Sequence, residues 1–161
     1  MSTVIDTLKN SNISDIANNT EAFAKFARDG GRNVLRAAVQ ARKLGIELST
    51  VANAAEGFLD FESSINAELE ASIMLGRNLN LQRARELSLA GDLEGLQQEI
   101  IKNVGSEAEF NQLNTLQRQS LAKALGVNVS EIQKLVSAEK EAVTLSGALS
   151  MAASETIIPE K

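Results

Sequence analysis

Apolar side chains recur every three or four residues along most of the chain, which is the period of an amphipathic α-helix. Glycines and capping residues interrupt this pattern and predict where each helix ends and the next begins. The predicted helices cover residues 21–44, 49–75, 79–90, 92–104, 106–125 and 130–150. Apolar and polar residues alternate only in the short triplets 46–48 and 127–129, so no significant sheet is predicted. We expect an all-α fold, an array of about six helices with helix-turn-helix-like corners.

The longest predicted helix, residues 49–75, carries a single apolar stripe along its length. Its members are Val51, Phe58, Phe61, Ile65 and Leu69. In the first helix, Gly30 and Gly31 interrupt the apolar pattern and predict a kink or a break. Ser106 with Glu109, and Ser130 with Gln133, have the spacing of capping boxes that begin the last two helices.

The distribution of polar residues predicts one main domain between two tails. Residues 1–20 are rich in Asn and Ser and are expected to form a flexible or weakly docked N-terminal arm. Residues 21–153 form the helical domain, with two lobes over 21–90 and 91–153 as an open alternative. Residues 154–161 are expected to be a C-terminal tail.

Two segments of the chain resemble each other at an offset of 81 residues. Residues 41–51 (ARKLGIELSTV) match residues 122–132 (AKALGVNVSEI). In each, a glycine, Gly45 or Gly126, ends one helix, and a serine, Ser49 or Ser130, is expected to cap the next. The similarity arises either from a common helix-turn-helix solution used twice or from a duplication that implies two similar lobes.

The composition excludes the commonest kinds of catalytic chemistry. The chain has no Cys and no His, so it lacks thiolate chemistry, the commonest general base and the commonest metal ligand. We therefore expect a protein that is not an enzyme, with no cofactor, no metal and no small-molecule substrate. Its apolar residues are mostly small and aliphatic, which predicts a thin core with modest stability, or one completed by self-association.

The net charge of −5 disfavours binding to nucleic acid and to anionic membranes. No apolar run approaches 18 residues, so stable membrane insertion is not expected. Charge is nevertheless segregated along the chain. Residues 24–43 are mainly basic and residues 47–70 carry only acidic charges, and the candidate partner-binding residues are Arg28, Arg32, Arg36, Glu56, Asp60 and Glu68.

These charged residues allow more than one interpretation. Arg28, Arg32 and Arg36 are four residues apart and would share one face of a continuous helix. That face is either an anion-binding stripe or, as we favour, one side of a hairpin or subunit contact whose other side is acidic. Glu56 and Asp60 could suggest metal or acid–base chemistry, but a solvated acidic face is the commoner arrangement without His.

The second corner also has the apolar spacing of a DNA-binding helix-turn-helix. Its recognition face would present Ser130, Glu131, Gln133, Lys134 and Ser137. That set contains no Arg to read guanine and begins with a carboxylate that would repel the DNA backbone. Nucleic acid is therefore not the expected partner, although a DNA-binding regulator is the leading alternative.

Residues 44–137 resemble a segment of tail tape-measure-type proteins of tailed bacteriophages. The resemblance lies in residues 59–70 (LDFESSINAELE), 75–81 (LGRNLNL), 84–87 (AREL), 91–93 (GDL), 99–100 (EI), 105–111 (GSEAEFN) and 119–127 (QSLAKALGV). It implies a virion structural or assembly protein that is made in the bacterial cytoplasm and located in the phage tail. Such a protein would bind other tail proteins or itself, and no individual functional residue can be transferred.

Whole tape-measure proteins are much longer than 161 residues and rich in coiled coil. The resemblance therefore implies a compact domain of such a protein or a small related virion protein. Besides the DNA-binding regulator, a general helical adaptor is a third hypothesis.

Overall fold

The computed structural model describes residues 20–138, and its regular structure there is entirely helical. The helices are α2 (Thr20–Phe26), the 3-10 helix η1 (Asp29–Gly31), α3 (Arg32–Lys43), α4 (Leu48–Leu59), α5 (Phe61–Leu75), α6 (Gln82–Ala90), α7 (Leu93–Val104), α8 (Glu107–Asn111) and α9 (Thr115–Leu125). A further helix begins at residue 129 and reaches the end of the described range. No strand occurs between residues 20 and 138, which confirms the all-α prediction. The predicted arm and tail lie outside the described residues, apart from Thr20.

The expected count of about six helices is wrong, because three predicted helices are each divided, one of them (residues 21–44) at the Gly30–Gly31 interruption. Residues 49–75 are divided at Asp60, whose backbone is not helical and whose side chain accepts a hydrogen bond from Ser63 N at 3.4 Å. Residues 106–125 are divided at Asn114, which exchanges side-chain and backbone hydrogen bonds with Gln117 in a capping box. Neither of these last two sites contains Gly or Pro, so their breaks come from side chains that cap a new helix.

The Gly30–Gly31 interruption is a real break, as predicted. Asp29, Gly30 and Gly31 all have positive φ values, and this short segment separates α2 from α3. The Asn33 side chain bridges the break, because its Nδ2 donates to Phe26 O at 2.7 Å and to Gly91 O at 3.0 Å. One amide side chain thus ties α2 to the corner between α6 and α7.

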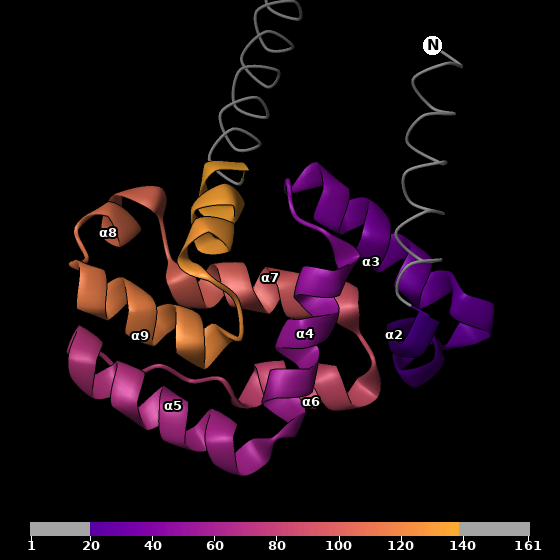
Figure 1. The fold of residues 1–161 in the computed structure, drawn as a ribbon, viewed down its shortest axis with the longest axis horizontal. Helices are drawn as coiled ribbons and strands as arrows, with labels where there is room; N and C mark the ends of the chain where they lie inside the picture. Colours follow the sequence, from indigo (N-terminus) through magenta and orange to yellow (C-terminus); the bar gives the residue numbers. More distant parts are fainter. Residues whose placement is uncertain (1–19, 139–161) are drawn as a thin grey trace, which may run out of the picture.

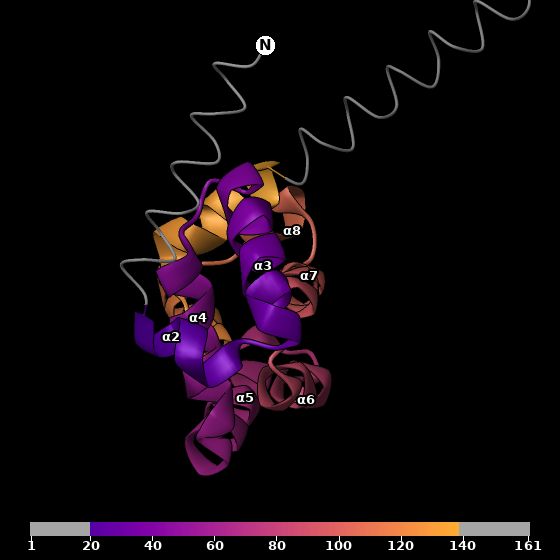
Figure 2. The ribbon, with the colours of Figure 1, turned by 90° about the vertical axis from the view of Figure 1, so that its right-hand side faces the viewer.

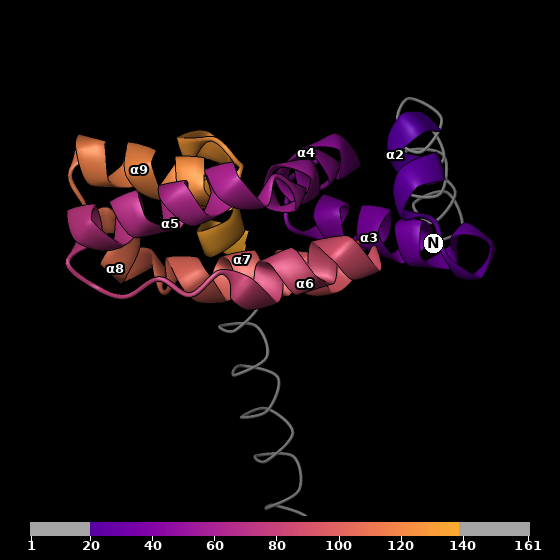
Figure 3. The same ribbon diagram turned by 90° about the horizontal axis from the view of Figure 1, so that it is seen from below.

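The helices enclose one hydrophobic cluster of buried residues that runs from Phe26 to Val136. Figure 1 shows α4 crossing the middle of the body, with α5 and α9 side by side at one end and α2 and α3 at the other. In Figure 2, α3 lies between α4 and α7, with which it packs. Figure 3 shows α6 and α7 along one side of the body and α5 and α9 along the opposite side. Fully buried alanines such as Ala37, Ala41 and Ala54 keep neighbouring helices close together.

The two predicted corners share one backbone geometry. Gly45 and Gly126 have φ values of 79° and 73°, and each is followed by the six-to-one hydrogen bond of a Schellman motif. These bonds run from Ile46 N to Ala41 O at 2.9 Å and from Val127 N to Ala122 O at 3.1 Å. The corners also touch, because Thr50 Oγ1 donates to Glu131 Oε2 at 2.5 Å, and these two residues are equivalent at the offset of 81.

The prediction that Ser49 and Ser130 cap the helices after these corners is wrong. Glu47 is the N-cap of α4, so Ser49 lies inside the helix and its hydroxyl donates to Glu47 Oε2 at 3.4 Å. At the second corner Asn128 accepts from Glu131 N, while Glu131 Oε1 accepts from Asn128 N, both at 2.8 Å. Each turn uses only two residues after its glycine-containing helix end, so the next helix begins earlier than a serine cap requires.

Candidate functional site: an exposed apolar stripe on α5

Helix α5 leaves its large apolar side chains in solvent. We call this row, Phe61, Ile65, Leu69 and Ile73, the α5 stripe. The exposed fractions of these residues are 46, 43, 58 and 83%, in that order. Their spacing of four residues places them in one continuous row along the outer side of the helix.

The single stripe predicted over residues 49–75 is therefore wrong in its second half. Val51 and Phe58 on α4 are 1% exposed and belong to the core, whereas Phe61, Ile65 and Leu69 lie in solvent. The break at Asp60 explains the difference, because it lets α5 turn a different side toward the rest of the protein. In Figures 1 and 2, α5 lies along the outer edge of the body.

The buried side of α5 consists of small and polar residues. Ser64, Ala67 and Ala71 are at most 8% exposed, and they allow α9 to pack closely against the helix. Small side chains at a helix contact let the two backbones approach. Helix α5 is thus inverted relative to an ordinary surface helix, which buries its large apolar side chains.

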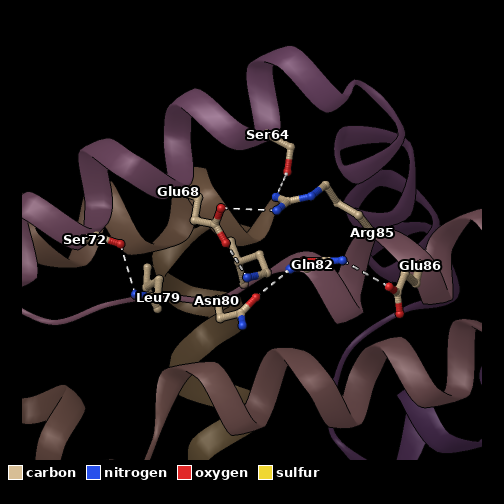
Figure 4. Close-up of polar contacts among 9 residues, drawn as sticks. Ser64, Glu68, Ser72, Leu79, Asn80, Gln82, Arg85 and Glu86 are labelled. Carbon is tan, nitrogen blue, oxygen red and sulfur yellow. Dashed lines mark hydrogen bonds and ion pairs between the residues drawn. The ribbon is translucent and has the colours of Figure 1, made fainter.

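A hydrogen-bonded network fixes this orientation, and we call it the α5 clamp (Figure 4). Arg85 of α6 donates from Nη1 to Ser64 Oγ at 3.1 Å and from Nη2 to Glu68 Oε2 at 3.2 Å. Glu68 Oε1 also accepts from the backbone N–H of Leu81, and Ser72 Oγ accepts from Leu79 N at 3.0 Å. The row Ser64, Glu68 and Ser72 therefore holds the 76–81 connection and α6.

The clamp is sheltered from water, because the Arg85 and Glu68 side chains are 13 and 14% exposed. Breaking a sheltered, hydrogen-bonded ion pair leaves a charge without its partner, which costs far more than losing a surface pair. Rotating α5 to bury its stripe would break this pair and separate the small-residue contact with α9. Helix α5 therefore cannot turn its stripe into the core without losing these contacts, although fully burying one Leu or Ile side chain stabilises by about 1.5–3 kcal/mol.

Further apolar surface lies at the end of the stripe. Gln117 Nε2 donates to Met74 O at 3.2 Å, which places the start of α9 beside the end of α5. Met74 is 41% exposed and Leu116, the neighbour of Gln117, is 64% exposed. One edge of the stripe is polar, with Glu62, Asn66 and Glu70 all exposed. An apolar band with a polar edge is typical of a protein contact surface.

The predicted basic face is not one helix face. Arg28 precedes η1 and has an extended backbone, and its guanidinium donates to Ala27 O at 2.9 Å. Of the three predicted arginines, two lie on α3, Arg32 and Arg36. Arg36 pairs loosely with Glu94 of α7 at 3.9 Å. The break at residues 29–31 turns Arg28 away from the row that a continuous helix would form.

The predicted acidic residues also serve different purposes. Glu56 pairs with Lys25 at 2.8 Å, and this hydrogen bond and the Glu56 charge raise the pKa of Lys25 above its usual 10.5. Asp60 caps α5 and Glu68 belongs to the clamp. Within residues 20–138, acidic side chains do not gather in groups of three that could hold a metal ion.

The face proposed to read DNA at the second corner is engaged in protein contacts. Glu131 binds Asn128 and Thr50, and the Ser137 hydroxyl donates to Glu107 Oε2 at 3.0 Å. Ser130 and Lys134 are exposed there. An inserted recognition helix needs several free side chains that reach base edges, and these contacts occupy part of the candidate set.

A polar groove of about 580 Å³ lies between the 76–81 connection, α6 and α7. Its lining includes Asn78, Asn80, Gln82, Arg83, Glu86 and Asn103. These groups could hydrogen-bond a polar molecule, but the groove lacks the apolar walls of most small-molecule sites. We therefore regard the α5 stripe as the stronger candidate site.

None of the helices within residues 20–138 combines the length and apolarity needed to cross a bilayer. Comparison with protein families, with curated proteins and with solved structures found no match to this chain.

Proposed function

We propose that this chain is a non-enzymatic structural or assembly protein that acts through protein–protein contacts. The observation that carries the proposal is the inverted helix α5, which buries small and polar residues and exposes a row of four large apolar ones. A clamp of sheltered hydrogen bonds maintains this exposure at the expense of apolar burial. A surface that stays exposed under such a constraint is best explained by a partner that covers it.

Within that class, we place the chain in the tail of a tailed bacteriophage, as a domain of a tape-measure-type protein or as a small relative. Support comes from the resemblance over residues 44–137, from the all-α fold and from the absence of His and Cys in the sequence. Assembly would take place in the bacterial cytoplasm and the final location would be the virion. The partners would be other tail proteins or further copies of the chain.

The DNA-binding regulator receives less support. Each corner joins two helices through a short turn with a left-handed glycine, but the second corner uses Glu131 and Ser137 to bind its own chain. A general helical adaptor would use the same stripe and would differ from a virion protein only in its partner.

Mass spectrometry of purified phage particles that encode the chain tests the proposal directly. We expect the chain in intact particles, at a copy number comparable to other internal tail proteins. Phage carrying Leu69→Glu should assemble few complete tails, because a buried carboxylate at a contact has no partner. Leu89→Glu is the matched control, since Leu89 is a leucine of similar exposure, 65%, on α6.

Two results would contradict the proposal. The first is a chain that is abundant in infected cells but missing from purified particles, which would remove the virion assignment. The second is normal tail assembly by phage carrying Leu69→Glu, which would show that the stripe is not a contact surface. Tight, salt-sensitive binding to duplex DNA would instead favour the regulator.

A further inference from the structure

We infer that the α5 stripe binds the α5 stripe of a second copy of this chain, so that the protein forms a two-fold homodimer. This inference rests on the proposed function, because it names the partner of the same contact surface. It follows from the size of the stripe, from its geometry and from the poor fit of the exposed face of α3 to it.

The exposed apolar area suits a small dimer interface. Taking 150 Å² for each residue, the lower end of the roughly 150–250 Å² that an aromatic side chain buries, the exposed fractions of the stripe leave about 350 Å² uncovered on one copy. Two facing stripes cover at most about 700 Å², and Leu116 with the polar edge supplies the remainder of the roughly 1,000 Å² expected of a specific interface. A stripe that met only polar side chains would bury much less apolar surface.

The shape of the stripe fits helix-on-helix packing. Phe61, Ile65, Leu69 and Ile73 form one ridge of side chains spaced by four residues. Ridges of this kind on two helices interdigitate at a crossing angle of about −50°, the commonest class of helix packing. A two-fold interface uses one patch twice, so a patch of a single chemical kind is complementary to itself.

Within residues 20–138, the outer side of α3 is another exposed face, and it matches the stripe less well. The outer side of α3 presents Arg32 and Arg36 but only one large exposed apolar residue, Leu35 at 45%. It could meet the acidic edge of α5 but could not cover four apolar side chains. On the acidic edge, Lys123 lies 3.7 Å from Glu70, which reduces the charge that two facing stripes would bring together.

Sedimentation velocity and light scattering on the full chain, over a range of concentrations, test the inference. We expect a mass that rises toward twice 17.2 kDa with concentration. Raising the salt concentration should strengthen the dimer, because salt screens the acidic edges and favours apolar burial. Leu69→Glu should raise the dissociation constant about 100-fold. Leu89→Glu should leave it within about twofold, and circular dichroism confirms that each variant is folded.

Three outcomes would overturn the inference. A chain that stays monomeric at all concentrations has no such dimer. A dimer that Leu69→Glu leaves intact uses another surface. An association that salt weakens, and that Arg32→Glu with Arg36→Glu abolishes, would be a contact between α3 and α5 of successive copies. If the wild type is monomeric while Leu69→Glu still blocks tail assembly, the proposed function survives and only the choice of partner fails.

Discussion

Alanine substitutions at Gly45 and Gly126 should have unequal effects, although the two glycines occupy equivalent corners. Both have a φ above 70°, where a side chain costs about 1–2 kcal/mol. A Cβ atom at Gly45 would meet nothing within 4 Å. At Gly126 it would lie 3.0 Å from Ala54 Cα and 3.3 Å from Ala54 O.

The contact at Gly126 is with backbone atoms of α4, which cannot rotate away. Helix α9 would have to move from α4, and overpacking of this kind costs about 1–3 kcal/mol. We therefore expect Gly45→Ala to lower the free energy of unfolding by about 1–2 kcal/mol and Gly126→Ala to lower it by about 2–5 kcal/mol. The difference between the two losses in free energy of unfolding measures the cost of separating α9 from α4.

Urea unfolding followed by far-ultraviolet circular dichroism measures both values, since the chain contains no Trp or Tyr for fluorescence. All samples should have the same protein concentration, because a dimer makes apparent stability depend on it. Equal losses for the two variants, or a greater loss for Gly45→Ala, would refute the packing of Gly126 on Ala54.

Two further predictions test the caps and the clamp. Asn128→Ala should lower the free energy of unfolding by about 1 kcal/mol because it removes a helix cap, whereas Ser130→Ala should change it by less than about 0.5 kcal/mol. Equal effects of the two variants in the same urea assay would contradict Asn128 as the cap of this helix. Glu68→Ala should cost about 2–3 kcal/mol, because Arg85 and Leu81 N lose their acceptor, while the exposed control Glu62→Gln should change the stability by less than about 0.5 kcal/mol. Small effects of both carboxylate variants would show that the clamp does not fix α5.

Local signals in the sequence predicted the fold class and many helix ends. The period of the apolar residues is a property of single helices, so it identifies them without knowledge of their neighbours. Gly45 and Gly126 end helices in the left-handed conformation, and Ser106 caps the helix that follows it. These features depend on contacts within about five residues, which is why they can be recognised along the chain.

The candidate site depended on the tertiary structure. Periodicity shows that Phe61, Ile65 and Leu69 share a face, but not whether that face meets the core. The small residues Ser64, Ala67 and Ala71 were a signal for the packed side that the pattern of large residues concealed. The break at Asp60 and the pair between Glu68 and Arg85 decide which side turns inward.

The sequence by itself thus determined that the chain forms helices, where glycines end them and which reactive side chains it lacks. Only the tertiary structure decided that α5 turns its polar row inward and its apolar row outward. The physical reason is that helix formation is set by near neighbours, whereas the orientation of a helix is set by contacts between residues far apart in the chain.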